Sequence, residues 1–128
     1  MTAGLADTSV FIAKEGNRPM RIERLPDAVA VSVITSGELR AGVLAAADLD
    51  VRDQRLATLT RALEMDPVPI DQVVAEAWAS LRVSLRDLGL RMPVNDSWIA
   101  ATAIALGIPV ITQDEDYLHA PGLEVIHI

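Results

Sequence analysis

The chain has 128 residues, 51% of them hydrophobic, and this length and composition predict one folded domain with a substantial core and exclude a disordered segment. The absence of cysteine excludes a disulfide framework and a thiolate metal site, and it suits the reducing cytoplasm, where we expect the protein to act. The formal net charge of −7 argues against general attraction to nucleic acid, and no apolar run reaches the roughly 20 residues that cross a bilayer.

The N-terminal stretch predicts one strand followed by two short helices. Residues 2–7 form a short apolar run that predicts a buried strand ending near Asp7. Residues 8–16 predict a helix that stops at a glycine, and residues 18–26 predict a second short helix that stops at a proline. No basic, apolar leader pattern precedes them, so we expect no signal peptide.

The next stretch predicts a core strand that leads into a capped helix. Residues 28–34 are rich in β-branched side chains, which favour a strand. The sequence Thr-Ser-Gly-Glu follows at residues 35–38 and fits a capping box, in which Thr35 caps the helix and Glu38 closes the cap. The helix is expected to continue through residues 39–47.

The middle of the chain predicts two amphipathic helices separated by a short edge strand. The first helix covers residues 51–65, and residues 66–70 carry two prolines, which favour the edge of a sheet. Asp71 is the predicted N-cap of the second helix, in which apolar residues recur with helical spacing until Gly89.

The C-terminal stretch returns to strands. Asn95 is the predicted cap of a helix over residues 96–106, and strands are predicted over residues 108–112 and 123–128 on either side of an acidic loop. Strands that alternate with helices indicate a parallel α/β sheet with right-handed crossovers. Ligands bind such sheets beyond the carboxyl ends of the strands.

Four carboxylates are expected at this edge of the sheet: Asp7, Glu38, Asp96 and Asp114. Each has an ordinary explanation as a helix cap, a first-turn acid or a turn residue. Together, however, clustered carboxylates raise one another's pKa and destabilise a fold unless a cation neutralises them. A carboxylate-rich set of oxygen ligands suits Mg²⁺ or Mn²⁺.

The chain resembles the PIN-domain ribonucleases, specifically the VapC toxins of type II toxin–antitoxin systems. No one block of sequence carries the resemblance, which depends on the order and spacing of four of them. These blocks are LADTSVFI (5–12), VSVITSGELRAGV (31–43), VNDSWIAATAIALGIPVIT (94–112) and TQDEDYLHAPGLEVI (112–126).

The resemblance implies a fold and a metal site. The fold would be a single PIN domain over residues 1–128, a three-layer α/β/α sandwich around a parallel sheet of four or five strands. Asp7, Glu38, Asp96 and Asp114 match the family's acids that bind Mg²⁺ or Mn²⁺, and Asp116 matches an auxiliary ligand. Ser9 and Thr112 match hydroxyl positions that hydrogen-bond the acids.

Two residues depart from the family pattern. Tyr117 stands where phenylalanine is usual, a change we attribute to packing. Glu115 adds an acid between Asp114 and Asp116, so the identity of the fourth ligand among these three stays open, with Asp114 favoured because it lies nearest the strand end.

The resemblance also implies an activity and partners. The protein would be a toxin that hydrolyses RNA, tRNA or another structured RNA, as a metal-dependent endoribonuclease that uses an activated water. Its partners would be a VapB-type antitoxin and a second copy of the chain in a homodimer. The alternative is a catalytically inactive PIN fold that acts only as a binding module.

Two other α/β families fit less well. A phosphoacceptor receiver domain needs a lysine after a late strand, and the single lysine is Lys14. A haloacid-dehalogenase-type phosphatase needs Asp-x-Asp after the first strand, where this chain reads Asp7-Thr8-Ser9.

RNA contacts would have to come from local basic patches, because the whole chain is acidic. Two arginine clusters are candidates, although either can equally be an ordinary solvated face: Arg18, Arg21 and Arg24, and Arg82 with Arg86. Trp78 and Trp98 fall on apolar helical stripes and are expected in packing, and His127 is expected to be structural.

Overall fold

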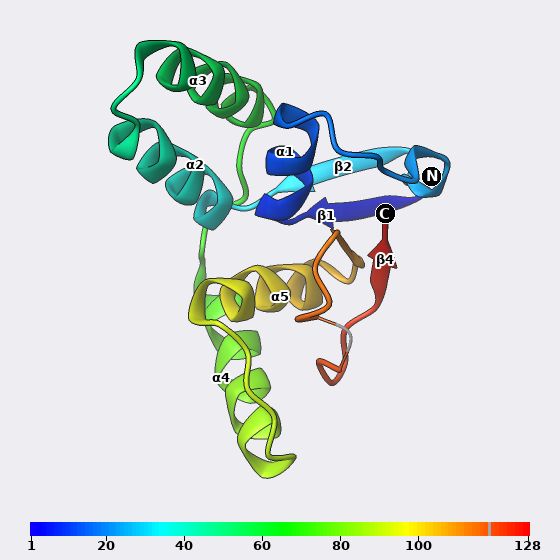
Figure 1. Cartoon of the computed structure of the whole chain (residues 1–128). Coiled ribbons are helices and arrows are strands. Elements are labelled where there is room, and N and C mark those ends of the chain that lie inside the picture. The colour runs from blue at the N-terminus through cyan, green and yellow to red at the C-terminus, as the bar shows by residue number, and fades with distance from the viewer. Residues whose placement is uncertain (118) are drawn as a thin grey trace.

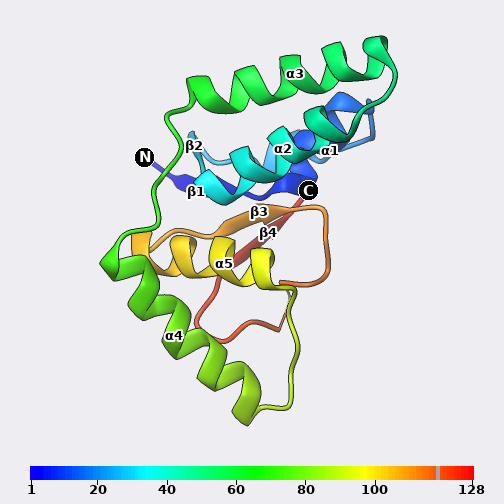
Figure 2. The same ribbon diagram turned by 90° about the vertical axis from the view of Figure 1, so that its left-hand side faces the viewer.

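The computed structural model describes residues 1–117 and 119–128, and these form a three-layer α/β sandwich. The central sheet has four parallel strands in the order β2-β1-β3-β4: β1 (Ala3–Ala6), β2 (Ala28–Val31), β3 (Val110–Thr112) and β4 (Val125–His127). The α-helices are α1 (Thr8–Glu15), α2 (Val33–Ala45), α3 (Leu49–Glu64), α4 (Gln72–Asp87) and α5 (Val94–Leu106). Helices α1, α2 and α3 lie on one side of the sheet and α4 and α5 on the other (Figures 1 and 2). The predicted sandwich is therefore confirmed.

Strand β1 lies in the middle of the sheet and sets its register. Ala6 is paired with Val31 of β2 on one side and with Ile111 of β3 on the other. The backbone N–H of Asp7 continues this pairing by donating to the carbonyl of Ile111 at 2.9 Å. Because all strands are parallel, their carboxyl ends meet at one edge, which is where Asp7 and the residues after β3 lie.

The core divides into two parts. The larger part joins the sheet to α4 and α5 through buried side chains that include Leu5, Leu81, Ile99 and Val110. The smaller part joins α2 to α3. Helix α5 is rich in alanine and its residues 99–103 are all buried, so this segment can lie close against the strands. The helix ends at Gly107, whose φ of 69° suits glycine.

The predicted capping box at the start of α2 is wrong. Strand β2 stops at Val31, and Ser32 is the N-cap, with its Oγ accepting the N–H of Ile34 at 3.0 Å. Val31 and Val33 bond to the backbone of Val68, which fixes the strand end three residues earlier than expected. The helix therefore already includes the Thr-Ser-Gly-Glu stretch.

Three smaller expectations also need correction. Residues 18–26 hold only a 3-10 turn, η1 (Ile22–Arg24), because proline stands near both ends of this short stretch. Residues 66–70 form no strand; only Val68 bridges, to Ser32. Asn95 lies inside α5, whose N-cap is Pro93. Among the described residues, no helix is both long enough and apolar enough to cross a membrane.

Candidate functional site

The four predicted acids line one pocket of about 240 Å³ at the carboxyl edge of the sheet. Asp7 directly follows β1, and Glu38 lies in the second turn of α2. Asp96 lies in the first turn of α5, and Asp114 lies two residues beyond β3. The remaining lining residues are Thr8, Ser9, Ile12 and Arg18. Four segments far apart in the sequence therefore bring carboxylates to one place.

Asp7 is the most buried of these acids, with 1% of its surface exposed. It caps α1: Oδ1 accepts the N–H of Ser9 at 3.1 Å and the Ser9 hydroxyl, while Oδ2 accepts the Thr112 hydroxyl at 2.9 Å. Burial raises the pKa of Asp7 from 3.8 to about 6, although the hydrogen bonds from Ser9 and Thr112 oppose the rise. The side chain of Asp7 is thus held in a fixed position, but its hydrogen bonds do not fully offset the cost of burying its negative charge.

The same two hydroxyls also hold the loop that carries Asp114. The Thr112 Oγ1 accepts the N–H of Asp114 at 2.8 Å, and the Ser9 Oγ accepts the N–H of Gln113 at 2.9 Å. The hydrogen bonds expected of Ser9 and Thr112 are therefore present. They link Asp7 to the start of the acidic loop, so the position of one acid constrains the other.

Glu38 is held by a threonine pair that the sequence did not predict. The Thr8 hydroxyl donates to Glu38 Oε1 at 2.7 Å and lies 3.0 Å from the hydroxyl of Thr35. Thr35 is fully buried, so its hydroxyl is a fixed partner for Thr8. The only available sequence signal for Thr35 was its resemblance to a cap, which pointed to a different role.

The closest group of acids consists of Asp96, Asp114 and Asp116. One carboxylate oxygen from each lies within 4.8 Å of the others. Asp116, expected only as an auxiliary ligand, belongs to this group. Asp7 and Glu38 do not belong to the group, but they line the same pocket as Asp96 and Asp114. Burial raises the pKa of Asp96 to about 7, and neighbouring Asp7 and Asp116 add to the rise. Burial and Asp116 also raise the pKa of Asp114.

Tyr117 lies beneath this group and is fully buried. Its hydroxyl is close enough to Asp96 to lower the pKa of that carboxyl, but it makes no hydrogen bond of normal geometry with any described residue. Burial and the adjacent carboxylates raise the pKa of Tyr117, so it stays protonated and can only donate to an acid. Tyr117 also belongs to the larger part of the core, which agrees with the packing role that we expected.

The pocket fits a hard divalent cation. Its charged donors are carboxylate oxygens, the ligand type that Mg²⁺ and Mn²⁺ favour. The raised pKa values of Asp7, Asp96 and Asp114 indicate carboxylates that lack sufficient positive charge nearby. Arg18 is the one cationic side chain among the lining residues, and it lowers the pKa of Asp114. Arg24 of the same predicted cluster instead donates to the backbone carbonyl of His127 at 3.1 Å.

Trp78, Trp98 and His127 make packing or backbone contacts. Trp78 and Trp98 stack with ring centroids 4.3 Å apart, which agrees with packing. His127 Nε2 lies 3.1 Å from the carbonyl oxygen of Gln113, at the base of the acidic loop.

A parallel α/β sandwich with carboxylates at the strand ends defines the class of this protein. The model of the PIN domain family matches residues 5–123, and the chain belongs to that family.

The relatives narrow the class further. The chain is 48% identical over 126 residues to Ribonuclease VapC5 of Mycobacterium tuberculosis, covering 98% of this chain and 93% of that one. It is 50% identical over 129 residues to Ribonuclease VapC4 of the same organism, covering 97% and 95%. A solved structure of a member of the VapBC family of toxin–antitoxin systems, VapBC-5 from M. tuberculosis, matches with a TM-score of 0.91, 46% identity and full coverage of both chains.

Proposed function

We propose that this protein is a metal-dependent endoribonuclease and the toxin of a type II toxin–antitoxin pair that acts in the cytoplasm. The observation that carries the proposal is the meeting of Asp7, Glu38, Asp96 and Asp114 in one pocket. The chain holding that pocket is 48% identical to a protein named Ribonuclease VapC5. The substrate class we propose is tRNA or another structured RNA.

Asp7, Glu38, Asp96 and Asp114 would hold Mg²⁺, or Mn²⁺ in its place, with Asp116 as a further ligand. When bound, the cation supplies an activated water and neutralises charge on the scissile phosphate. The protein's own part is to fix the ligands in advance. Ser9 and Thr112 orient Asp7, and Thr8 orients Glu38. Thr112 also holds the backbone at Asp114, so these ligands are held in place without the cation.

Cleavage of RNA by the purified protein tests this proposal. We expect hydrolysis with Mg²⁺ or Mn²⁺ and none with excess chelator. Asp7→Asn and Asp96→Asn should each lower the rate at least a hundredfold, because each removes a charge that the cation needs. Asp53→Asn, an exposed acid of α3, is the matched control and should cleave normally.

A protein that binds RNA but does not cleave it with any divalent cation would instead be the inactive PIN-fold binding module. Unchanged cleavage by Asp96→Asn would show that the acids have no role in the reaction. Either result would overturn the proposed activity.

The proposed partners are a VapB-type antitoxin and a second copy of the chain. A solved structure that matches this chain is of a VapBC family toxin–antitoxin system, which supports an antitoxin here. A groove of about 300 Å³ between α1 and α2 offers a place for an antitoxin helix, lined by Ile12, Leu39 and Gly42 and shared with Glu38 of the acidic pocket. Residues 18–26, which hold only the 3-10 turn η1, contribute no lining residue to this groove.

Co-expression tests the antitoxin, and light scattering tests the dimer. A reading frame next to the gene should yield a small protein that co-purifies and suppresses toxicity. Persistent toxicity with nothing co-purified would overturn the antitoxin proposal. A monomer at high concentration would overturn the dimer.

A further inference from the structure

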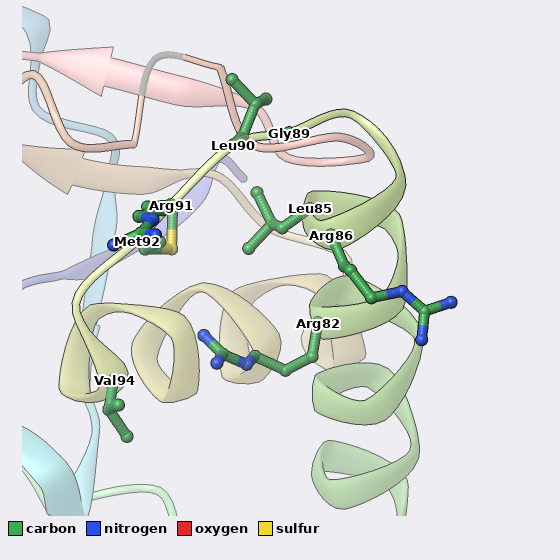
Figure 3. Close-up of a pocket in the computed structure, with 8 residues that line it drawn as sticks. All are labelled: Arg82, Leu85, Arg86, Gly89, Leu90, Arg91, Met92 and Val94. Carbon is green, nitrogen blue, oxygen red and sulfur yellow. The ribbon is translucent and has the colours of Figure 1, made fainter.

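We propose that a second pocket, next to the acidic one, binds a backbone phosphate of the RNA on one side of the cleavage point; this inference rests on the proposed function. The pocket has a volume of about 560 Å³ and lies where α4 ends and α5 begins. Its lining includes Arg82, Leu85, Arg86, Arg91, Met92 and Val94 (Figure 3). We call it the arginine pocket.

The charge of the arginine pocket is opposite to that of the acidic pocket. Three guanidinium groups line it and no carboxylate does. Arg86 points away from the other two in Figure 3 and pairs with Asp87 at 3.2 Å. Arg82 extends from α4 toward α5, and Arg91 lies in the connection that leads into α5 (Figure 3). Neither has an ion-pair partner among the residues that the structure describes. These two guanidinium groups are therefore available to an external anion.

Arg82 is held in position before any ligand arrives. Its guanidinium carbon lies 5.7 Å from the centroid of the Trp78 ring, which itself stacks on Trp98. A cation–π contact of this kind limits the rotamers of the arginine. The guanidinium fork can then bind two phosphate oxygens with little further loss of conformational entropy. The buried side chains of Leu85 and Met92 add apolar surface to the lining, and a lower local dielectric strengthens a charge interaction beside them.

The arginine pocket is linked to the acids through a third cavity. Arg91 and Met92 also line a smaller cavity of about 190 Å³ together with Glu115 and Asp116. Asp116 belongs to the closest group of acids. An RNA strand whose scissile phosphate lies at the acids can therefore reach Arg91 within the neighbouring nucleotides.

The arginine pocket also explains how an acidic protein can hold RNA. The chain carries a net charge of −7 and its active pocket is lined by acids, so RNA is repelled by both. Local cations next to the acids are needed to hold the strand. Each phosphate contact with single-stranded nucleic acid contributes a salt-dependence slope of about 0.7, equivalent to about fivefold in affinity at 0.1 M salt.

The experiment measures binding of a short single-stranded RNA by fluorescence anisotropy, in excess chelator and over a series of salt concentrations. We expect Arg91→Gln to weaken binding about fivefold at 0.1 M salt and to lower the slope by about 0.7. The double variant Arg82→Gln/Arg91→Gln should weaken binding about 25-fold and lower the slope by about 1.4. Arg91→Lys should keep the slope, because the charge remains.

Arg61→Gln is the matched control, since Arg61 is an exposed arginine of α3 outside both lining sets. It should bind RNA as the wild type does. Arg91 is exposed and precedes α5, so its replacement tests the inference even if loss of the Arg82–Trp78 contact unfolds the double variant.

The outcomes separate this inference from the proposed function. Wild-type cleavage together with normal RNA binding by Arg91→Gln would overturn the phosphate site and leave the ribonuclease standing. Weakened binding by Arg91→Gln in a protein that never cleaves RNA would support the phosphate site and overturn the proposed ribonuclease activity. If Arg91→Gln binds RNA normally and instead loses self-association in light scattering, the pocket is an interface between copies and the inference is wrong.

Discussion

The hydroxyl of Thr112 donates to Oδ2 of Asp7 at 2.9 Å, although the two residues are 105 positions apart in the chain. Oγ1 of Thr112 also accepts the backbone N–H of Asp114 at 2.8 Å. One fully buried side chain thereby joins the end of β1, the end of β3 and the loop that carries Asp114, Glu115 and Asp116. Thr112 therefore helps to fix Asp7 and Asp114 relative to each other.

Replacing Thr112 by valine should therefore destabilise the protein. Thr112→Val keeps the shape of the side chain, removes a donor to a buried carboxylate and removes the acceptor for the Asp114 N–H. We expect the free energy of unfolding to fall by about 1–3 kcal/mol at pH 8, measured by urea denaturation. Thr60→Val is the control, because Thr60 is exposed on α3 and bonds only within its own helix, and it should stay within about 0.5 kcal/mol of wild type.

The stability of the metal-free protein should decrease as the pH rises. The folded-state pKa is about 6 for Asp7 and about 7 for Asp96, both above their ordinary value of 3.8. The folded protein therefore binds these protons more tightly than the unfolded chain does. The resulting stabilisation is fully present below about pH 4 and is lost as the pH rises through about 7.

Urea denaturation of the wild type and of Asp7→Asn/Asp96→Asn in chelator, from pH 4 to pH 8, measures this dependence. The free energy of unfolding of the wild type should fall relative to that of the variant as the pH rises. Added Mg²⁺ should stabilise only the wild type at pH 8. A wild type that gains stability over the variant between pH 4 and pH 8 would contradict the raised pKa values.

Tyr117→Phe should leave the metal-free protein as stable as the wild type or make it more stable. The substitution removes a buried hydroxyl that has no hydrogen-bond partner among the described residues, and such groups cost about 1–3 kcal/mol. Thermal unfolding in chelator at pH 5 and at pH 8 measures the effect. A loss of more than about 1 kcal/mol would mean that the hydroxyl forms a full hydrogen bond with Asp96 in solution.

Gly4→Ala should destabilise the sheet. A Cβ at this position in β1 would lie 2.8 Å from Cδ1 of Ile111 and 3.1 Å from the ring of Pro26, which is closer than atoms normally pack. We expect a loss of about 1–3 kcal/mol. Gly37→Ala is a matched control on the exposed side of α2, where a Cβ meets nothing within 4 Å, and it should gain up to about 1 kcal/mol from helix propensity. Equal effects at the two positions would contradict this packing.

The location of the acids could be predicted from the sequence because two of them depend on simple local order. Asp7 and Asp114 follow apolar runs closely, and the carboxyl ends of parallel strands must meet at one edge of a sheet. Asp96 and Glu38 could be predicted because each lies near the start of a helix adjoining a strand.

The features that could not be predicted depend on contacts between distant segments. Ser32 and Thr35 are both acceptable helix caps, and the backbone bonds to Val68 decide between them. That choice places Thr35 inside α2, where it supports Thr8 and, through it, Glu38. Similarly, Arg91 lies in a connection without periodic pattern, so its position beside Arg82 follows only from the path of the chain between α4 and α5.

The central place of β1 in the sheet has a consequence for synthesis on the ribosome. Its partner β3 begins at Val110, so the first strand made must wait for most of the chain before its second edge is paired. At about 5–20 residues per second this delay lasts several seconds. The long sequence separation of these contacts also slows folding. Asp7 cannot join Asp114 during that interval, so the acidic pocket forms only after most of the chain has been made.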